Sequence, residues 1–160
     1  MKKALLLVLA LAVIPVGVDA QVTPSDSCAA LSFESPLEDV IPCAEQGTAL
    51  AQFNLGVMYA YGEGVPEDDT EAVRWYRLAA EQGNARGQTA LGYMYGTGQG
   101  GPEDIVLAYM WWHLAAAQGD EVGQNNKDRA EERMTREQIA EGQRLSTEWL
   151  EAHPPAGTSS

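Results

Sequence analysis

Apolar residues recur at spacings of three and four positions along two adjacent stretches of the chain, which is the pattern of an amphipathic helix. In the first stretch the residues on the common face are Ala51, Leu55, Met58, Tyr59 and Gly62. In the second stretch they are Ala72, Trp75, Tyr76, Ala79 and Ala80. The connecting "GEGVPEDD" contains glycines that can adopt positive φ and a proline that cannot continue a helix, and Asp68, Asp69 or Thr70 can cap the next helix. The pattern therefore predicts a helical hairpin.

The hairpin pattern returns 36 residues later. Nine of fourteen positions are identical between "LGVMYAYGEGVPED", which begins at Leu55, and "LGYMYGTGQGGPED", which begins at Leu91. A fixed period of this length is typical of stacked supersecondary units. We predict an all-α fold, an α/α solenoid of antiparallel helical hairpins with two full repeats, at about residues 44–79 and 80–115, plus capping helices. The repeated positions with an expected structural role are Leu55, Gly56, Tyr59, Gly62, Gly64, Leu91, Gly92, Tyr95, Gly98 and Gly100.

Two of these glycines lie inside predicted helices, where glycine costs roughly 1 kcal/mol relative to alanine. They are Gly56 and Gly92. We expect that each lets two neighbouring hairpins approach closely, because a side chain there would hold them apart. Replacing Gly56 with leucine should therefore destabilise the fold.

The predicted repeat domain spans residues 33–150, and the repeat weakens at both of its ends. Upstream, "SPLEDVIPCAEQG" indicates a degenerate second helix that is shortened by Pro42. The flanking residues 21–32 and 151–160 are polar or contain proline, and we expect them to be disordered.

The C-terminal cap is predicted at residues 116–150. Charged residues there replace the leucine, glycine and tyrosine of the repeat, as suits a terminal unit with one face in solvent. A last helix should begin at Thr135, which can form a capping box with Gln138. The charged replacements are Lys127, Asp128 and Glu131.

The first twenty residues have the features of a secretory signal peptide. A basic "MKK" precedes an apolar stretch, and "VDA" places small residues before a cleavage site after Ala20. The alternative is an uncleaved membrane anchor, but the stretch contains Pro15 and Gly17 and is shorter than the ~20 residues that a span needs. We expect a periplasmic or secreted protein with no stable membrane insertion after cleavage.

The chain is acidic, with a formal net charge of −13. Removal of residues 1–20 takes away two lysines and one aspartate, which makes the net charge −14. Such a surface repels polyanions, so nucleic acid is not an expected partner.

Both cysteines, Cys28 and Cys43, lie near the start of the mature chain. Export permits a disulfide between them, and closing a loop of this length stabilises a protein by about 3 kcal/mol. Two free thiols are the alternative. Neither the spacing of the cysteines nor their neighbours suggest a metal site.

The motif A-x-x-x-L-G-x-M-Y, followed by a glycine turn and then A-x-x-W-Y or A-x-x-W-W, resembles the Sel-one-like (Sel1-like) repeat, a relative of the tetratricopeptide repeat. The resemblance covers roughly residues 44–150. It implies a non-catalytic scaffold or adaptor that binds a protein or peptide through its concave face. Bacterial relatives include periplasmic regulators of sensor kinases, so the partner could belong to a signalling or envelope complex.

The alternative function is a weak hydrolase that acts on β-lactams or cell-wall peptides. Cysteine-rich relatives reported to have such activity carry a cysteine pair in every repeat, whereas this chain has no cysteine after Cys43. The chain also lacks the G-x-S-x-G, S-x-x-K and H-E-x-x-H motifs. We therefore predict that the protein is not an enzyme and assign it no catalytic residue.

No cofactor or metal site is predicted either. "GTGQGG" at residues 96–101 fits G-x-G-x-x-G but follows a predicted helix and precedes Pro102, which is the wrong context for a dinucleotide site. The two histidines, His113 and His153, have no partners in the pattern that would complete a metal site, and we expect both to be solvated.

By analogy with related solenoids, the first helices of successive repeats should line the concave groove. By the 36-residue period, the residues that face away from the hairpin partner are predicted to be Asn54, Val57 and Tyr61, then Ala90, Tyr93 and Thr97, then Asn126, Arg129 and Arg133. Tyrosine suits contacts that are both apolar and hydrogen-bonded. The two arginines suit a carboxylate, and we expect a peptide or loop to bind with a carboxylate toward Arg129.

Overall fold

The computed structural model describes residues 28–32 and 34–154, and these ranges contain helices and no strand. The expected signal peptide at residues 1–20 and its cleavage site after Ala20 lie outside the described residues. So do residues 21–27 and 155–160 of the two ends expected to be disordered. The helices are α2 (Leu37–Glu45), α3 (Ala49–Tyr61), α4 (Asp69–Glu81), α5 (Ala85–Thr97), α6 (Ile105–Ala117), α7 (Glu121–Glu131) and α8 (Arg136–Ala152).

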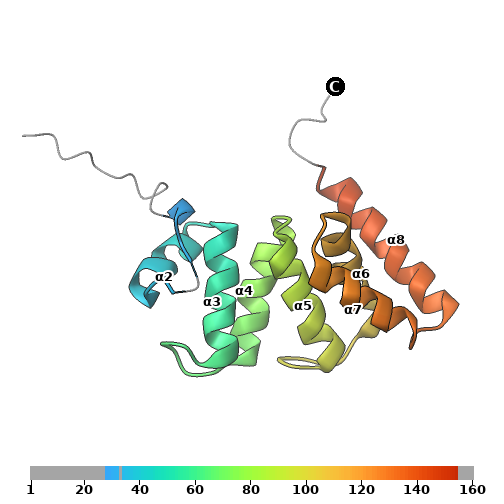
Figure 1. The fold of residues 1–160 in the computed structure, drawn as a ribbon, viewed down its shortest axis with the longest axis horizontal. Helices are drawn as coiled ribbons and strands as arrows, with labels where there is room; N and C mark the ends of the chain where they lie inside the picture. Colours follow the sequence, from blue (N-terminus) through green and yellow to red (C-terminus); the bar gives the residue numbers. More distant parts are fainter. Residues whose placement is uncertain (1–27, 33, 155–160) are drawn as a thin grey trace, which may run out of the picture.

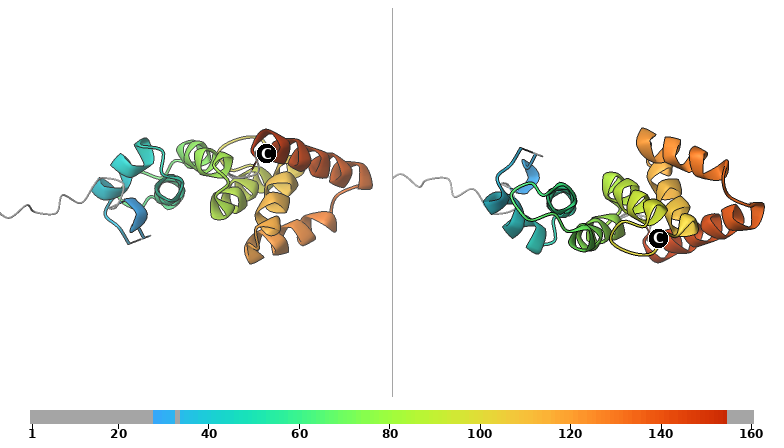
Figure 2. Two further views of the ribbon diagram at one scale, coloured as in Figure 1. Left: turned by 90° about the horizontal axis from the view of Figure 1, so that it is seen from above. Right: turned by 90° about the horizontal axis from the view of Figure 1, so that it is seen from below.

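The helices form antiparallel hairpins that stack in a row, which confirms the predicted α/α solenoid (Figure 1). Each helix from α2 to α6 packs on the next along the chain, and α8 packs on α6. Seen from above and from below, α7 and α8 flank α6 on opposite sides (Figure 2). The last hairpin of the row is therefore closed by α8.

Each full hairpin has the same turn. The first helix ends at a left-handed glycine, Gly62 (φ 69°) in one unit and Gly98 (φ 71°) in the next. The second helix begins after Asp68 or Asp104, whose carboxylate accepts hydrogen bonds from two N–H groups of the first turn. Each turn therefore satisfies helix-end groups on both sides, which fixes where the helices stop.

The glycines inside α3 and α5 pack against aromatic rings of their own hairpin. A Cβ atom on Gly56 would lie 2.5 Å from Cδ1 of Tyr76 in α4. A Cβ atom on Gly92 would lie 2.6 Å from Nε1 of Trp112 in α6. The expected reason for these glycines was close approach between neighbouring hairpins, and the structure corrects it, because the contact is between the two helices of one hairpin.

Neighbouring hairpins approach closely at a different pair of glycines. A Cβ atom on Gly87 would lie 2.8 Å from Cβ of Ala79, and one on Gly123 would lie 2.8 Å from Cβ of Ala115. Both contacts join the second helix of one hairpin to the first helix of the next. The equivalent position in α3 is Ala51, which is fully buried.

A buried glutamine links each hairpin to the helix before it. Gln52 Nε2 donates to the carbonyl of Ala44 at 3.2 Å, and Gln82 Nε2 donates to Gln52 Oε1 at 2.6 Å. The same two bonds recur around Gln88, at 3.3 and 2.8 Å. Because a buried amide without partners costs stability, these bonds also fix the register between hairpins.

The described domain begins before residue 33. Cys28 and Cys43 form a disulfide, and Cys28 is buried against α2 and α3 with Val40 and Leu55. Residues 28–32 therefore belong to the folded part of the chain, although the sequence suggested a boundary after residue 32. The disulfide and the packing of Cys28 and Leu31 against α2 and α3 place this segment on the fold.

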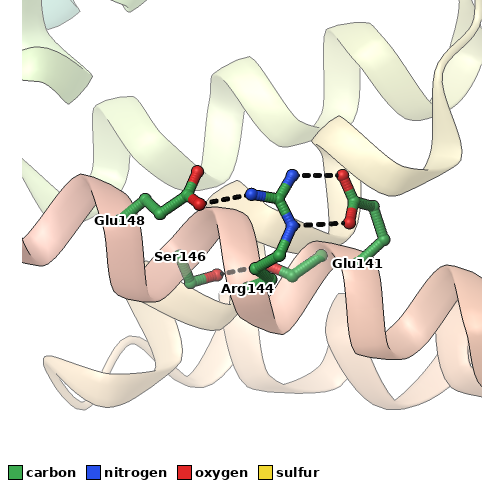
Figure 3. Close-up of polar contacts among 5 residues, drawn as sticks. Glu141, Arg144, Ser146 and Glu148 are labelled. Carbon is green, nitrogen blue, oxygen red and sulfur yellow. Dashed lines mark hydrogen bonds and ion pairs between the residues drawn. The ribbon is translucent and has the colours of Figure 1, made fainter.

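The C-terminal cap is held by α8. The capping box of Thr135 and Gln138 is present, as expected from the sequence. Ser146 is buried, and its hydroxyl lies 2.8 Å from the Gly142 carbonyl of its own helix and 3.3 Å from the Met110 carbonyl of α6. On the exposed face, Arg144 pairs with Glu141 and Glu148 (Figure 3). Such exposed ion pairs contribute little to stability, so burial against α6 holds the helix.

A polar cluster joins α6 to α7 beside His113. Tyr109 Oη donates to Glu131 Oε1 at 2.8 Å, and Lys127 Nζ lies 3.6 Å from the same carboxylate oxygen. His113 is half-buried and its Nδ1 has no hydrogen-bond partner in the described chain. Burial lowers the pKa of His113 below its ordinary value of 6.5, and Lys127 lowers it further, while Glu131 opposes the shift.

We expect this histidine to make the fold less stable at mildly acidic pH. A lowered folded-state pKa means that folding favours neutral His113. The stability that depends on neutral His113 is therefore complete above pH 6.5 and is lost as the pH falls below that value. The melting temperature, measured by circular dichroism from pH 7 to pH 5, should fall less in His113→Gln than in the parent. His153→Gln is the matched control, and equal pH profiles for the parent and both variants would contradict the assignment.

Candidate binding groove

A hollow of about 460 Å³, here called the first hollow, lies between α3, α5 and the start of α7. Its buried lining is mainly apolar and comes from Phe53, Tyr76 and Met94. Burial raises the pKa of the Tyr76 phenol above its ordinary value of 10.0, and nearby Tyr61 and Asp69 raise it further. Tyr76 therefore presents a neutral ring and hydroxyl at physiological pH.

Exposed apolar side chains gather around the first hollow. Tyr61 is 72% exposed, Tyr93 is 51% exposed and Val122 is 59% exposed, and all three line it. Among the described residues, one further large apolar side chain is comparably exposed, Leu150 on α8 at 49%. Apolar side chains that converge on a hollow instead of scattering over a surface are typical of an interaction site.

A second hollow of about 300 Å³ continues the first toward the end of α7. Tyr93 and Asn126 line both hollows, so the two share a border. Arg129 and Arg133 line the second hollow, with Glu132 between them in sequence. Together the two hollows form the groove, which runs across α3, α5 and α7.

The groove changes in charge along its length. Near the first hollow, the Asp120 carboxylate accepts from Gly123 N at 2.6 Å and from Thr89 Oγ1 at 2.9 Å. These contacts occupy Asp120 as the N-cap of α7. Within the described chain, the side chains of Arg129 and Arg133 form no ion pair or hydrogen bond, so both guanidinium groups are available to a ligand.

Of the residues predicted for the groove, all but two line one or both of the hollows. Tyr61, Ala90, Tyr93 and Asn126 line the first hollow, and Tyr93, Thr97, Asn126, Arg129 and Arg133 line the second. Asn54 and Val57 line neither. Asn54 is 2% exposed and donates to the Ser32 carbonyl, while Val57 is half-buried and packs on the core.

Sequence reasoning missed Val122, the most exposed apolar residue of the groove after Tyr61. It lies in the first turn of α7, inside the degenerate third unit. The 36-residue period could have indicated this position, because Val122 follows Arg86 by 36 residues and Arg86 also lines the first hollow.

The two histidines are placed apart from the groove. His113 lies beside Tyr109 on α6, with ring centroids 5.8 Å apart, and His153 stacks on Trp149 at 4.4 Å. Within residues 28–32 and 34–154, no three side chains of histidine, cysteine, aspartate or glutamate come together as metal ligands would. The described helices also include none with the length and apolarity to cross a membrane.

A family model described as Sel1 repeat matches residues 49–84 and 85–120. The solved structures that are similar to the chain include two with this kind of repeat. The first is c5321, a protective antigen of uropathogenic Escherichia coli strains displaying an SLR fold, with 35% identity, a TM-score of 0.69, and coverage of 71% of this chain and 25% of that one. The second is a Sel1 repeat protein from Oxalobacter formigenes, with 40% identity, a TM-score of 0.54, and coverage of 55% and 26%.

The chain thus spans about a quarter of the length of each of these structures. Among curated proteins, none matches the chain.

Proposed function

Because residues 49–120 belong to the Sel1 repeat family, we propose that the chain is a non-catalytic adaptor that binds a segment of a partner protein in its groove. Sel1 repeats commonly mediate protein–protein interaction. The observation that carries the proposal is the convergence of Tyr61, Tyr93 and Val122 on the first hollow, beside the arginines of the second.

The chemistry of the groove favours a segment with one bulky apolar side chain and a nearby carboxylate. The apolar side chain would enter the first hollow and exclude water from Phe53 and Met94. The carboxylate would pair with Arg129 and Arg133, which present planar fork-shaped donors. On a chain with a net charge of −13, this arginine pair also selects against basic segments.

We further propose that the protein works in the periplasm or after secretion, in a signalling or envelope complex. A disulfide such as Cys28–Cys43 is typical of an oxidising, extracytoplasmic compartment. The basic start and apolar stretch of residues 1–20 support the same location. Nucleic acid remains an unexpected partner because of the negative charge.

The test begins with a photocrosslinking amino acid at position 93 in intact cells, followed by purification of the captured partner. Tyr93→Ala and Arg129→Glu should each weaken binding of that partner by about tenfold or more, because the first removes a central aromatic contact and the second reverses a charge. Isothermal titration calorimetry at two salt concentrations measures both effects. Only the loss from Arg129→Glu should shrink at high salt.

Matched control variants lie outside the groove. Leu150→Ala removes a side chain of similar exposure to Tyr93, and Arg136→Glu reverses an exposed charge at the start of α8. Both should bind as the parent does. If Tyr93→Ala and Arg129→Glu also bind like the parent, the groove is not the binding site.

A further inference from the structure

Three positions spaced by 36 residues occupy the same place on the first helices of the solenoid: Asn54 on α3, Ala90 on α5 and Asn126 on α7. Ala90 and Asn126 line the groove. Asn54 is 2% exposed although the repeat places it on the same face. The face of α3 is covered because the chain's own N-terminal segment, residues 28–32, lies over it.

The contact between that segment and α3 is made through the main chain. Asn54 Nδ2 donates to the carbonyl oxygen of Ser32 at 3.3 Å, and the same oxygen accepts from Ser35 N at 3.2 Å in a turn. Leu31 and Ser32 are not helical. The disulfide from Cys28 to Cys43 of α2 holds the start of the segment in place. Within the described residues, the non-helical end of this segment, Leu31 and Ser32, is therefore seated on a first helix, with an asparagine amide bound to its backbone.

Asn126 presents the same amide in the groove with nothing bound to it. It lies at the border of the two hollows, and its side-chain amide has no hydrogen-bond partner in the described chain. An asparagine amide offers two N–H donors and one carbonyl acceptor. Ala90, between the two asparagines, has no such group, so Asn126 is the member of the row that can bind a backbone from outside.

We propose that Asn126 binds a main-chain carbonyl of a non-helical partner segment that crosses α5 and α7, as Asn54 binds Ser32 on α3. The inference rests on the proposed function and deepens it. A helical partner is disfavoured because its carbonyls are used inside its own helix. The occupant is thus a loop or an unstructured peptide, with its apolar side chain in the first hollow and its carboxylate at Arg129 and Arg133.

The probe is a synthetic peptide selected on the purified protein from a displayed library of random peptides, and chosen because Tyr93→Ala abolishes its binding. Asn126→Ala should weaken this peptide about fivefold, the size of one net hydrogen bond. Asn125→Ala is the matched control, since Asn125 is an exposed asparagine on the same helix outside both hollows. It should leave binding unchanged.

An ester scan of the probe identifies the acceptor. Replacing one amide with an ester weakens the carbonyl as an acceptor, removes the N–H of the same peptide bond and keeps the shape of the backbone. At one position the ester should reduce affinity for the parent several-fold and have little effect on affinity for Asn126→Ala, which shows that the two groups are coupled.

The outcomes separate the two proposals. If the selection yields no peptide that depends on Tyr93, the groove is not a peptide site, and both the proposed function and this inference fail. If such a peptide is found but Asn126→Ala binds it as tightly as Asn125→Ala does, or no ester position couples to Asn126, the proposed function stands and this inference is overturned. A peptide that is helical when bound, by circular dichroism difference spectra, would also overturn it.

Discussion

Replacing Gly92 with leucine should lower the free energy of unfolding by about 3 kcal/mol, the upper end of the usual range for overpacking. A Cβ atom there would lie 2.6 Å from Nε1 and 2.7 Å from Cδ1 of Trp112, and 3.0 Å from the carbonyl oxygen of Ala108. The indole cannot move aside freely, because its N–H donates to the Thr89 carbonyl at 3.1 Å. The helix propensity gained by removing a glycine, about 1 kcal/mol, is too small to offset this.

The melting temperature measured by circular dichroism should fall by on the order of 10 °C in Gly92→Leu. Gly101→Leu is the matched control, because Gly101 lies in the next turn with nothing within 4 Å of a Cβ atom and no positive φ. Equal melting temperatures for the two variants would show that α5 and α6 can separate without cost.

The 36-residue period was sufficient to predict the hairpins, their turns and their stacking. Left-handed Gly62 and Gly98 and the capping aspartates lie where the pattern placed them, because these roles depend on local backbone chemistry. The period could not identify what Gly92 packs against. A repeat reports that a position is constrained, but the contact depends on how the helices rotate about their axes.

The period also predicted most of the residues that line the groove, but not which of them are covered. Periodicity placed Tyr61, Tyr93 and Arg129 on the first helices, and the structure brings them to the two hollows. It also placed Asn54 there, but a segment outside the repeat covers that residue. Coverage of this kind depends on a non-local contact that no spacing within the repeat encodes.

Removing the disulfide should cost about 3 kcal/mol, the chain-entropy value for a loop of this length. Cys28 and Cys43 are separated by 15 residues, and both side chains are buried with Val40 and Leu55. We use the double variant Cys28→Ala/Cys43→Ala, because alanine leaves no polar group in this buried site. Its melting temperature should lie on the order of 10 °C below that of the parent.

The same variant tests whether the disulfide keeps residues 28–32 in place on the surface of α3. Without it, residues 28–32 are held by the hydrogen bond from Asn54 to Ser32, whose net worth is about 1 kcal/mol, and by the packing of residue 28 and Leu31 against the core between α2 and α3. The amide N–H groups of these residues should then exchange with solvent far faster than in the parent, measured by hydrogen–deuterium exchange, whereas those of α6 should change little. A reducing agent should reproduce both effects in the parent and add nothing in the double variant. If exchange in residues 28–32 stays slow after the disulfide is removed, packing alone holds the segment on α3. Asn54 would then be buried because of side-chain contacts and not because of the disulfide.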